Sequence, residues 1–292
     1  MLTSSPSPVF TALKEFLKGK FQILELVPHG SSSFHKTYKV ITSEGDYFVK
    51  ANSGNHTKSM FSTEAKGLRL LKSTKSIGVP DVIDCGSQSG FNFLVLEFIH
   101  PGKRISEYHE RLGEQLAKLH LHRAGEFGLD HHNYIGTIPQ QNTPSESGAN
   151  FMITQRYEPL LKNGVQKGVV PESLQRQFEL LFNKLDILLP NEPASLIHGD
   201  LWNGNCITGP DGKAWLIDPA IHYGYRESDL AMMKLFGGFD ASCYLAYLNA
   251  YELEPGWKER ISLFQIYPLL VHLNLFGTGY LPALRDAINE YL

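Results

Sequence analysis

The chain has 292 residues, of which 42% are hydrophobic and 20% are charged, and its formal net charge is −3. This length and composition predict a packed globular protein of one large domain or two lobes. The near-neutral charge, with no basic block along the chain, argues against nucleic acid or an anionic membrane surface as the main partner.

Residues 21–99 carry strand and turn patterns, interrupted by one helical pattern. Short runs rich in β-branched and aromatic residues, separated by turn sequences, predict strands at 21–27, 36–42, 47–52, 80–87 and 91–99. Apolar spacing predicts a helix over Lys58 to Lys72. The predicted order is therefore strand, strand, strand, helix, strand, strand.

Helical spacing dominates the rest of the chain. Leucines three or four residues apart predict helices over 104–123 and 172–188, and the tail from Ser228 onward is also predicted to be helical. The segment 124–150, rich in Gly, His, Asn and Pro, is predicted to be loop. The apolar stretch "IYPLLVHLNLF" near the C-terminus is interrupted by Pro, His and Asn, so it predicts a buried core helix and no membrane span.

Together these patterns predict an α+β fold with two lobes. Residues 1–98 form a small β-rich N-lobe with one main helix, and residues 99–292 form a larger, mainly helical C-lobe. The three cysteines, Cys85, Cys206 and Cys243, are far apart and form no C-x-x-C pair, so no disulfide framework or zinc site is predicted. The N-terminus lacks the basic and apolar segments of a secretion signal, and we expect a cytoplasmic protein. The patterns predict no particular oligomeric state.

The stretch "HGDLWNGN" at 198–205 concentrates polar side chains directly after an apolar run. Asp200 stands five residues before Asn205, and Asp218 follows thirteen residues after Asn205. The Gly-Pro-Asp-Gly turn between them predicts a hairpin that brings Asn205 and Asp218 together at its open end. Such oxygen ligands suit Mg²⁺, which completes its shell with water and substrate phosphates. Protein kinases share this spacing, and their first carboxylate accepts the proton of the attacking hydroxyl.

A kinase site also needs a lysine on a strand and a glutamate on the following helix. Lys50 lies near the end of the strand-like run "YFVKAN", and Glu64 lies on the apolar face of the next predicted helix. Because burying an unpaired carboxylate is costly, Glu64 is predicted to pair with Lys50. The pair would hold the lysine against the α- and β-phosphates of ATP. Taken alone, each residue has a plainer interpretation, as a solvated lysine and a carboxylate that reaches water.

Two further features complete the predicted site. A Gly/Ser turn precedes Lys50 by about one hairpin, and it is predicted to cover phosphates with the backbone N–H groups of Gly30, Ser31, Ser32 and Ser33. Asp229, near the start of a helix predicted to begin at Ser228 or Asp229, either caps that helix or braces the catalytic loop through its amides. His198 is predicted to support the loop structurally.

Several stretches resemble the fructosamine kinase family, also called ketosamine 3-kinases. They are "LIHGDLWNGN", "LIDPAIHYGYRESDLAMMKLFGGF" and "HLNLFGTGY", supported by "FVKAN", "MFSTEAKGLRLL" and "LGEQLAKLH", and they span roughly residues 20–285. The resemblance implies a protein-kinase-like fold of the aminoglycoside-phosphotransferase type. It also implies transfer of the γ-phosphoryl group of ATP, with Mg²⁺, to carbon 3 of a ketosamine, the adduct of a sugar with a free or protein-linked amine. The phosphorylated adduct is unstable, so the implied activity is deglycation repair.

The resemblance also implies roles for individual residues. Asp200 would be the general base, and the metal ligands would be Asn205 and Asp218. The phosphate lysine and its ion-pair partner would be Lys50 and Glu64. The hinge that meets adenine would be formed by the backbone of Glu97, Phe98 and Ile99. The candidate substrate-binding residues are Trp202, whose indole would stack on a sugar face, and Tyr223.

The chain departs from the family in two places. Phe34 and His35 in "HGSSSFH" replace an apolar–Asn pair, which puts the phosphate-loop contacts in doubt. Around Asn150 the family's Asp-Trp pair is missing, which puts the acceptor preference in doubt.

Three other functions stay open at this point. A kinase for a cationic aminoglycoside or amino alcohol would have an acceptor pocket ringed by carboxylates. A binding-only pseudokinase is disfavoured because the expected polar positions are all filled. A zinc hydrolase would use His120, His122, His131 and His132, but their spacing fits no common zinc pattern, so surface or hydrogen-bonded histidines are favoured. The short segment between Asp218 and Asp229 also predicts a site that needs no phosphorylation-switched activation loop.

Overall fold

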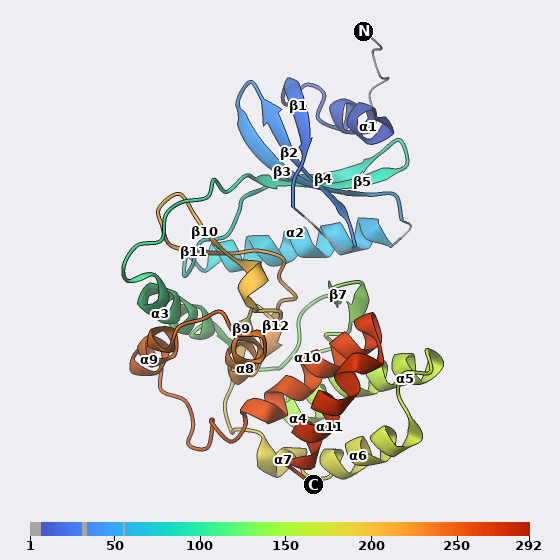
Figure 1. Cartoon of the computed structure of the whole chain (residues 1–292), viewed down its shortest axis with the longest axis vertical. Helices are drawn as coiled ribbons and strands as arrows, with labels where there is room; N and C mark the ends of the chain where they lie inside the picture. The colour runs from blue at the N-terminus through green and yellow to red at the C-terminus, as the bar shows by residue number, and fades with distance from the viewer. Residues whose placement is uncertain (1–6, 31–33, 55) are drawn as a thin grey trace.

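The computed structural model describes residues 7–30, 34–54 and 56–292, which fold into two lobes (Figure 1). The described strands of the smaller lobe form one antiparallel sheet in the order β1-β2-β3-β5-β4. The elements of this lobe are α1 Pro8–Phe16, β1 Ile23–Pro28, β2 Lys36–Thr42, β3 Gly45–Asn52, α2 Thr57–Ser73, β4 Val82–Gln88 and β5 Phe91–Glu97. The predicted order of strands and main helix is confirmed. The predicted lobe boundary after residue 98 lies one residue beyond the end of β5.

Helix α1 is absent from the predicted elements, although its local pattern favours a helix. The hydroxyl of Ser7 accepts a hydrogen bond from the Phe10 amide over 3.4 Å, and proline occupies the first turn. Val9 and Leu13, one helical turn apart, are buried against the outer face of the sheet together with Val95. The helix therefore covers a sheet face that would otherwise be exposed to water.

The alternation of side chains along β3 decides which residues face the cleft. Val49 and Ala51 point into the core under α1. Phe48 and Lys50, one residue out of phase, point to the opposite face, where α2 lies. A one-residue shift in register would bury Lys50 under α1, so the strand pairing itself places the lysine.

The larger lobe is mainly helical. Its elements are α3 Tyr108–His120, β6 Arg123–Ala124, β7 Asn133–Ile135, β8 Ile138–Gln140, α4 Gly148–Phe151, a π-helical turn Met152–Tyr157, α5 Glu158–Gln166, α6 Glu172–Phe182, α7 Leu185–Leu188, β9 Ala194–Ile197, β10 Cys206–Thr208, β11 Ala214–Leu216, β12 His222–Gly224, α8 Glu227–Phe236, α9 Ala241–Ala250, α10 Ile261–Phe276 and α11 Leu281–Asn289. The predicted helix 172–188 is divided into α6 and α7. The segment 124–150, predicted to be loop, contains the short hairpin β7–β8 and the start of α4.

Helix α10 is the centre of the larger lobe, with α5, α8 and α11 packed around it (Figure 1). Leu263, Ile266, Leu270 and Leu273 on this helix are fully buried, which confirms the predicted core helix. Its apolar residues surround the helix axis because neighbouring elements cover several sides of it. None of the helices in the described part of the chain has the length and apolar character needed to cross a lipid bilayer.

The two lobes share one apolar core at their junction. Phe61 and Leu68 of α2 and Leu94 of β5 belong to the same buried cluster as Leu112 and Leu116 of α3. This continuous packing fixes the back wall of the space between the lobes.

Candidate active site

The predicted catalytic loop begins where the buried strand β9 ends. His198 and Gly199 donate their backbone N–H groups to the two carboxylate oxygens of Asp229, over 2.8 and 2.9 Å. The His198 ring accepts from the Asp200 amide at Nδ1, over 3.3 Å, and donates from Nε2 to the Ile217 carbonyl, over 2.9 Å. Burial lowers the pKa of His198, so the ring is neutral and suited to this donor–acceptor pair. Asp229 and His198 therefore hold the loop backbone from two sides.

Glycine is required at position 199 for two independent reasons. Its φ of +82° lies in the left-handed region, where a side chain is strained. A Cβ atom there would also lie 2.2 Å from the Ala220 carbonyl oxygen. The close approach allows the Ala220 amide to donate to the His198 carbonyl over 2.9 Å, which joins the loop to the segment after Asp218.

Asp200 and Asn205 are in direct contact. The Asn205 amide nitrogen Nδ2 donates to Oδ2 of Asp200 over 3.0 Å and to the Asp200 carbonyl over 2.9 Å. Burial raises the pKa of Asp200 to about 7, the hydrogen bond from Asn205 opposes that rise, and the charges of Asp218 and Asp229 add to it. A carboxylate with this pKa is suited to accept a proton near neutral pH.

The predicted hairpin between Asn205 and Asp218 is present. Strands β10 and β11 pair with Cys206 opposite Leu216, and the Ile217 amide donates to the Asn205 carbonyl over 3.0 Å. Asn205 and Asp218 therefore flank the open end of the hairpin. Asn205 directly precedes β10, and Asp218 directly follows Ile217, whose amide bonds Asn205. Asp218 has a φ of +54°, the left-handed conformation that is uncommon for residues other than glycine.

Lys50 joins the two lobes electrostatically. Its Nζ lies 2.7 Å from Oε1 of Glu64 on α2 and 2.7 Å from Oδ1 of Asp218. The Lys50 side chain is only 6% exposed. Burial alone would lower the pKa of Lys50, but the charges of Asp218 and Glu64 outweigh it and raise the pKa, so the ammonium stays charged. The predicted pair of Lys50 and Glu64 thus forms, and it also includes Asp218.

These residues line one cleft of about 740 Å³ between the lobes. Lys50 and Glu64 line it from the smaller lobe, and Asp200, Asn205 and Asp218 line it from the larger lobe. This volume is typical of sites for nucleotide-sized ligands.

The predicted nucleotide-binding residues have different positions. Gly30 lines the cleft, whereas Ser31, Ser32 and Ser33 lie outside the described residues. Glu97 ends β5, and Phe98 and Ile99 follow it; among the described lining residues of the cleft these three do not appear. The ring of Phe98 does pack against His29, which lines the cleft, with centroids 5.1 Å apart.

The cleft also contains a histidine that the motif analysis did not assign to the site, and this histidine contacts an asparagine that is not among the described lining residues. His35 lies beside Lys50, and burial together with the Lys50 charge lowers the pKa of His35 to about 4. Asn52, at the end of β3, donates from Nδ2 to the Phe34 carbonyl over 2.9 Å and contacts Nδ1 of His35 at 3.1 Å. Asn52 therefore holds Phe34 and His35, which follow the turn predicted to cover the phosphates. Its position two residues after Lys50, on the same face of β3, could have indicated this role.

Aromatic side chains form a connected series along the cleft. Adjacent rings are 4.9 to 6.4 Å apart in the series Trp202, Phe236, His272, Phe276 and Phe34, with Tyr280 beside His272. All six residues line the cleft. We call this set the aromatic wall.

Tyr223, the other predicted substrate-binding residue, lies elsewhere. It is in β12 opposite Leu196 of β9, and its side chain packs against the apolar clusters of the larger lobe. It does not appear among the described residues that line the cleft.

The oxygen donors suit a divalent cation that arrives with a nucleotide. Asp200, Asn205 and Asp218 offer hard oxygens, which Mg²⁺ prefers. Within the described ranges, no group of three or more His, Cys, Asp or Glu side chains is arranged to hold a metal by itself. Mg²⁺ commonly takes one or two carboxylates and obtains its other ligands from water and phosphates. The Asp218 carboxylate contacts the ammonium of Lys50, so its position suits a positively charged partner.

The four histidines considered for zinc have other contacts. His120 is buried between the hydroxyl of Tyr247, at 2.8 Å, and Oδ2 of Asp229, at 3.2 Å. His122 contacts Ser76, and His131 contacts Asp130. His132 accepts a hydrogen bond from the Asn142 amide. These contacts explain the histidines as parts of local hydrogen-bond networks.

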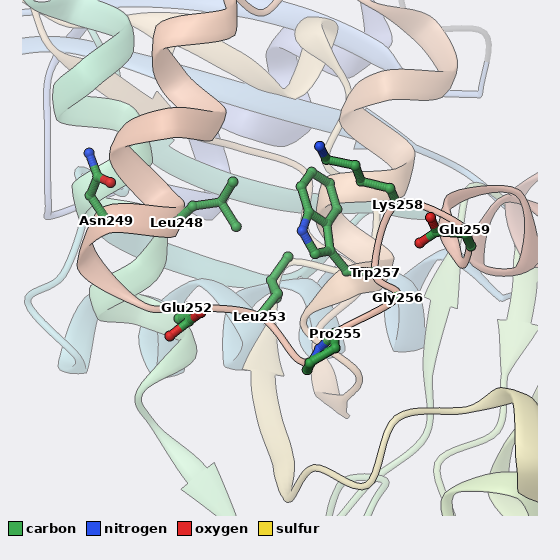
Figure 2. Close-up of a pocket in the computed structure, with 9 residues that line it drawn as sticks. All are labelled: Leu248, Asn249, Glu252, Leu253, Pro255, Gly256, Trp257, Lys258 and Glu259. Atoms are coloured by element: carbon green, nitrogen blue, oxygen red, sulfur yellow. The ribbon is translucent and has the colours of Figure 1, made fainter.

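A second hollow, of about 730 Å³, lies between the end of α9 and the loop before α10 (Figure 2). The side chains of Leu248, Leu253 and Trp257 turn toward one another there, and Lys258 lies beside the indole (Figure 2). It shares no lining residue with the cleft and gathers no set of groups suited to catalysis among the described residues.

The chain matches known proteins over nearly its full length. The family model described as fructosamine kinase matches residues 7–292. A "probable ketoamine kinase" of Enterococcus faecium is 36% identical over 260 residues, which cover 88% of this chain and 91% of that protein. The crystal structure of a Thermobifida fusca protein described as a fructosamine-3-kinase has a TM-score of 0.84 at 35% identity, covering 92% of this chain and 94% of that one.

A more distant structural likeness extends to the aminoglycoside phosphotransferase APH(4)-Ia. The structure of a thermostable mutant in ternary complex with AMP-PNP and hygromycin B has a TM-score of 0.60 at 14% identity, covering 95% of this chain and 97% of that one. At this identity the likeness shows a common fold, which is the predicted bilobal kinase-like fold.

Proposed function

Because this chain belongs to the fructosamine kinase family, we propose that it transfers the γ-phosphoryl group of ATP to a sugar hydroxyl of a ketosamine. The observation that carries the proposal is the convergence of Asp200, Asn205 and Asp218 opposite Lys50 in one cleft. ATP use is supported by the kinase-like fold, which the AMP-PNP complex of APH(4)-Ia shares. The conclusion is a phosphotransferase with an alcohol acceptor.

Asp200 is proposed to act as the general base. The acceptor hydroxyl gives its proton to the Asp200 carboxylate while its oxygen forms a bond to the γ-phosphorus. The bond from that phosphorus to the bridging oxygen breaks, and ADP leaves with the electron pair. A pKa of about 7 lets the carboxylate be ionised before the reaction and still accept a proton during it.

The remaining polar groups position the phosphates. Asn205 and Asp218 would hold Mg²⁺, which neutralises phosphate charge when it is bound. Lys50, kept charged and oriented by Glu64, lies where its ammonium can exchange Asp218 for phosphate oxygens. Catalysis in such a site consists mainly of positioning and charge stabilisation.

The acceptor is proposed to lie against the aromatic wall, with Trp202 stacked on the sugar face. The carboxylates among the described lining residues are Glu64, Asp200 and Asp218, all at the phosphate end of the cleft. An aminoglycoside carries several ammonium groups and would call for acidic side chains around the acceptor end. The aromatic wall suits a sugar with a single amine substituent better.

The site is proposed to be competent without phosphorylation. The segment after Asp218 does not form a long loop; it runs directly into β12, where His222 pairs with Ile197 of β9. The free thiols of Cys85, Cys206 and Cys243 support a reducing compartment, and we propose the cytoplasm.

The test is ATP turnover with a fructosyl-lysine analogue by the wild type and by Asp200→Asn. Removing the base should lower kcat by about 10² or more. Asp211→Asn is a matched control, since Asp211 lies in the β10–β11 turn, where its carboxylate accepts from the Lys213 amide. Equal rates for the wild type and Asp200→Asn would contradict the assignment of Asp200, and no turnover by the wild type would contradict the proposed function.

A further inference from the structure

The backbone of Asp218 needs an external restraint. Its left-handed conformation is unfavourable for a residue with a side chain, and such conformations persist only where the surroundings hold them. On the upstream side, the Ile217 amide and carbonyl are bonded to Asn205 and His198. The catalytic loop therefore fixes the chain before Asp218, and on the other side it contacts the chain through the Ala220 amide, which donates to the His198 carbonyl. The carbonyl groups that follow Asp218 have other partners.

Two buried amide side chains bind the carbonyl groups downstream of Asp218. Nε2 of Gln140 donates to the Ala220 carbonyl over 3.0 Å, and Nδ2 of Asn133 donates to the Ile221 carbonyl over 2.8 Å. Asn133 and Gln140 face each other at the open end of the β7–β8 hairpin, and they are 5% and 2% exposed. The hairpin thus presents both donors to the segment that follows Asp218, in addition to the contacts that the catalytic loop makes there.

The donors are oriented by further buried contacts. Oδ1 of Asn133 accepts from Nε2 of Gln140 and from Nδ2 of Asn142, each over 2.8 Å. Oδ1 of Asn142 accepts in turn from Nη2 of Arg156 over 2.8 Å. A guanidinium can only donate, so the oxygen of the Asn142 amide must point toward Arg156. The nitrogen of the Asn142 amide then points toward Asn133. Asn133 must then direct its own nitrogen to the Ile221 carbonyl.

Arg156 has no evident structural reason to be buried. It is 1% exposed, lies in the π-helical turn and, across the described residues, forms no ion pair. Its partners are neutral: the Gln141 and Gln155 carbonyls, Asn142, and the rings of Phe151 and Tyr267, whose centroids are 4.4 and 5.6 Å away. A buried charge without a counter-ion is costly, and π-helical turns are frequent at functional sites. The burial of the charge is explained if Arg156 fixes the orientation of the side-chain amides of Asn142 and Asn133.

The same network reaches the acceptor end of the cleft. The hydroxyl of Tyr267 donates to Oε1 of Gln140 over 2.8 Å. Tyr267 is on α10, and the next turn of that helix carries Val271 and His272, which line the cleft. Gln140 therefore contacts both the segment after Asp218 and the helix that supports the aromatic wall.

We propose that Asn133, Gln140, Asn142 and Arg156 form a positioning network that holds Asp218 in the conformation required to bind the divalent cation of a metal–nucleotide complex. We call this set the amide network. None of its members is proposed to touch the phosphates. The inference rests on the proposed function, because the cation is expected to arrive with ATP.

The test compares the binding of AMP-PNP with and without Mn²⁺, by titration calorimetry on the full chain. In the wild type, Mn²⁺ should tighten AMP-PNP binding because Asn205 and Asp218 contact the metal. Gln140→Leu removes the donor to the Ala220 carbonyl and one of the two donors that orient Asn133. It should reduce that Mn²⁺-dependent gain about tenfold or more, the range typical of residues that orient metal ligands. The affinity for AMP-PNP without metal, which reports on Lys50 and the phosphate loop, should change little.

Arg156→Met is the second variant, because it is expected to fold. Replacing a buried unpaired cation by an apolar side chain of similar volume is often neutral for stability. It should nevertheless reduce the Mn²⁺-dependent gain, since the Asn142 oxygen then loses the guanidinium donor that fixes its direction. The control is Asn274→Leu, another buried amide of the larger lobe, whose Nδ2 bonds only the Leu270 carbonyl of its own helix. That variant should keep the wild-type gain.

Thermal unfolding of each variant separates a loss of fold from a loss of position. A folded Gln140→Leu or Arg156→Met protein whose Mn²⁺-dependent gain stays within about twofold of the wild type would overturn the inference. A wild type that binds AMP-PNP equally with and without Mn²⁺ would instead contradict the proposed metal–nucleotide site.

Discussion

The proposed metal-binding end and the proposed acceptor end of the cleft are held in different ways. At the metal-binding end, His198 and Asp229 are fixed by directional hydrogen bonds to backbone groups, and Asp218 pairs with the buried ammonium of Lys50. At the acceptor end, the aromatic wall is held by ring packing, and Trp202, Phe236 and Phe276 remain 42%, 39% and 53% exposed. Phosphoryl transfer demands accurate placement of charge, whereas an acceptor with a variable amine needs a surface that tolerates different shapes.

Lys50→Met should produce the largest effect, because it breaks the metal-binding end. Removing one partner of a buried ion pair leaves Glu64 uncompensated, which costs about 3–5 kcal/mol in the free energy of unfolding. The loss of a preorganised charge at the phosphates should lower kcat about 10²-fold or more. Denaturant unfolding and steady-state kinetics measure the two effects.

Lys20→Met is the matched control for Lys50→Met. Lys20 pairs with Asp84 at 2.5 Å, but its side chain is 51% exposed, so the stability change should stay below about 1 kcal/mol. Similar losses of stability in the two variants would contradict the claim that burial makes the Lys50 pair important.

The pH dependence of kcat/KM should sharpen the comparison, since it includes the ionisation of Asp200 in the free enzyme. Burial raises the pKa of this carboxyl to about 7, and only the deprotonated form can accept the proton. Activity should therefore rise with pH up to about 7 and then level off, falling about tenfold per unit below that value. A profile that is flat from pH 5 to pH 8 would show that no group with this pKa limits the free enzyme.

Trp202→Ala should have the smallest effect, confined to the acceptor end. Loss of a stacked indole is expected to cost about 1–1.5 kcal/mol of acceptor binding, so the KM for the ketosamine should rise about fivefold to tenfold. The KM for ATP should not change. Trp257→Ala, in the second hollow, supplies the control and should leave both values at the wild-type level. An equal rise in both KM values would place the indole at the nucleotide instead.

The parts of the site that could be predicted lie close together in the sequence. Asp200, Asn205 and Asp218 are linked by one hairpin, so turn residues and spacing were sufficient to bring them together. The pairing of Lys50 with Glu64 followed from the cost of an unpaired buried carboxylate. The lysine's further contact with Asp218, 168 residues away, depends on how the lobes pack.

The amide network could not be predicted, because its contacts are non-local and its residue types are ambiguous. Gln140 and Asn133 reach carbonyl groups 80 and 88 residues away. The segment that contains them is rich in Gly, Asn and Pro without periodicity, which favoured a loop over the hairpin that forms. Tyr223 shows the opposite problem: a motif places it beside the site in the sequence, but strand alternation turns its side chain into the apolar packing.

Phosphorus NMR of the reaction products tests the central claim most directly. Wild-type protein, ATP, Mg²⁺ and a fructosyl-lysine analogue should give one new phosphate-ester resonance, coupled to a sugar proton, for each ADP formed. Because the phosphorylated adduct is unstable, the spectra are recorded during turnover. Release of ADP with inorganic phosphate, with no ester at any time and no release of the free amine, or no ADP at all, would contradict transfer to a ketosamine hydroxyl.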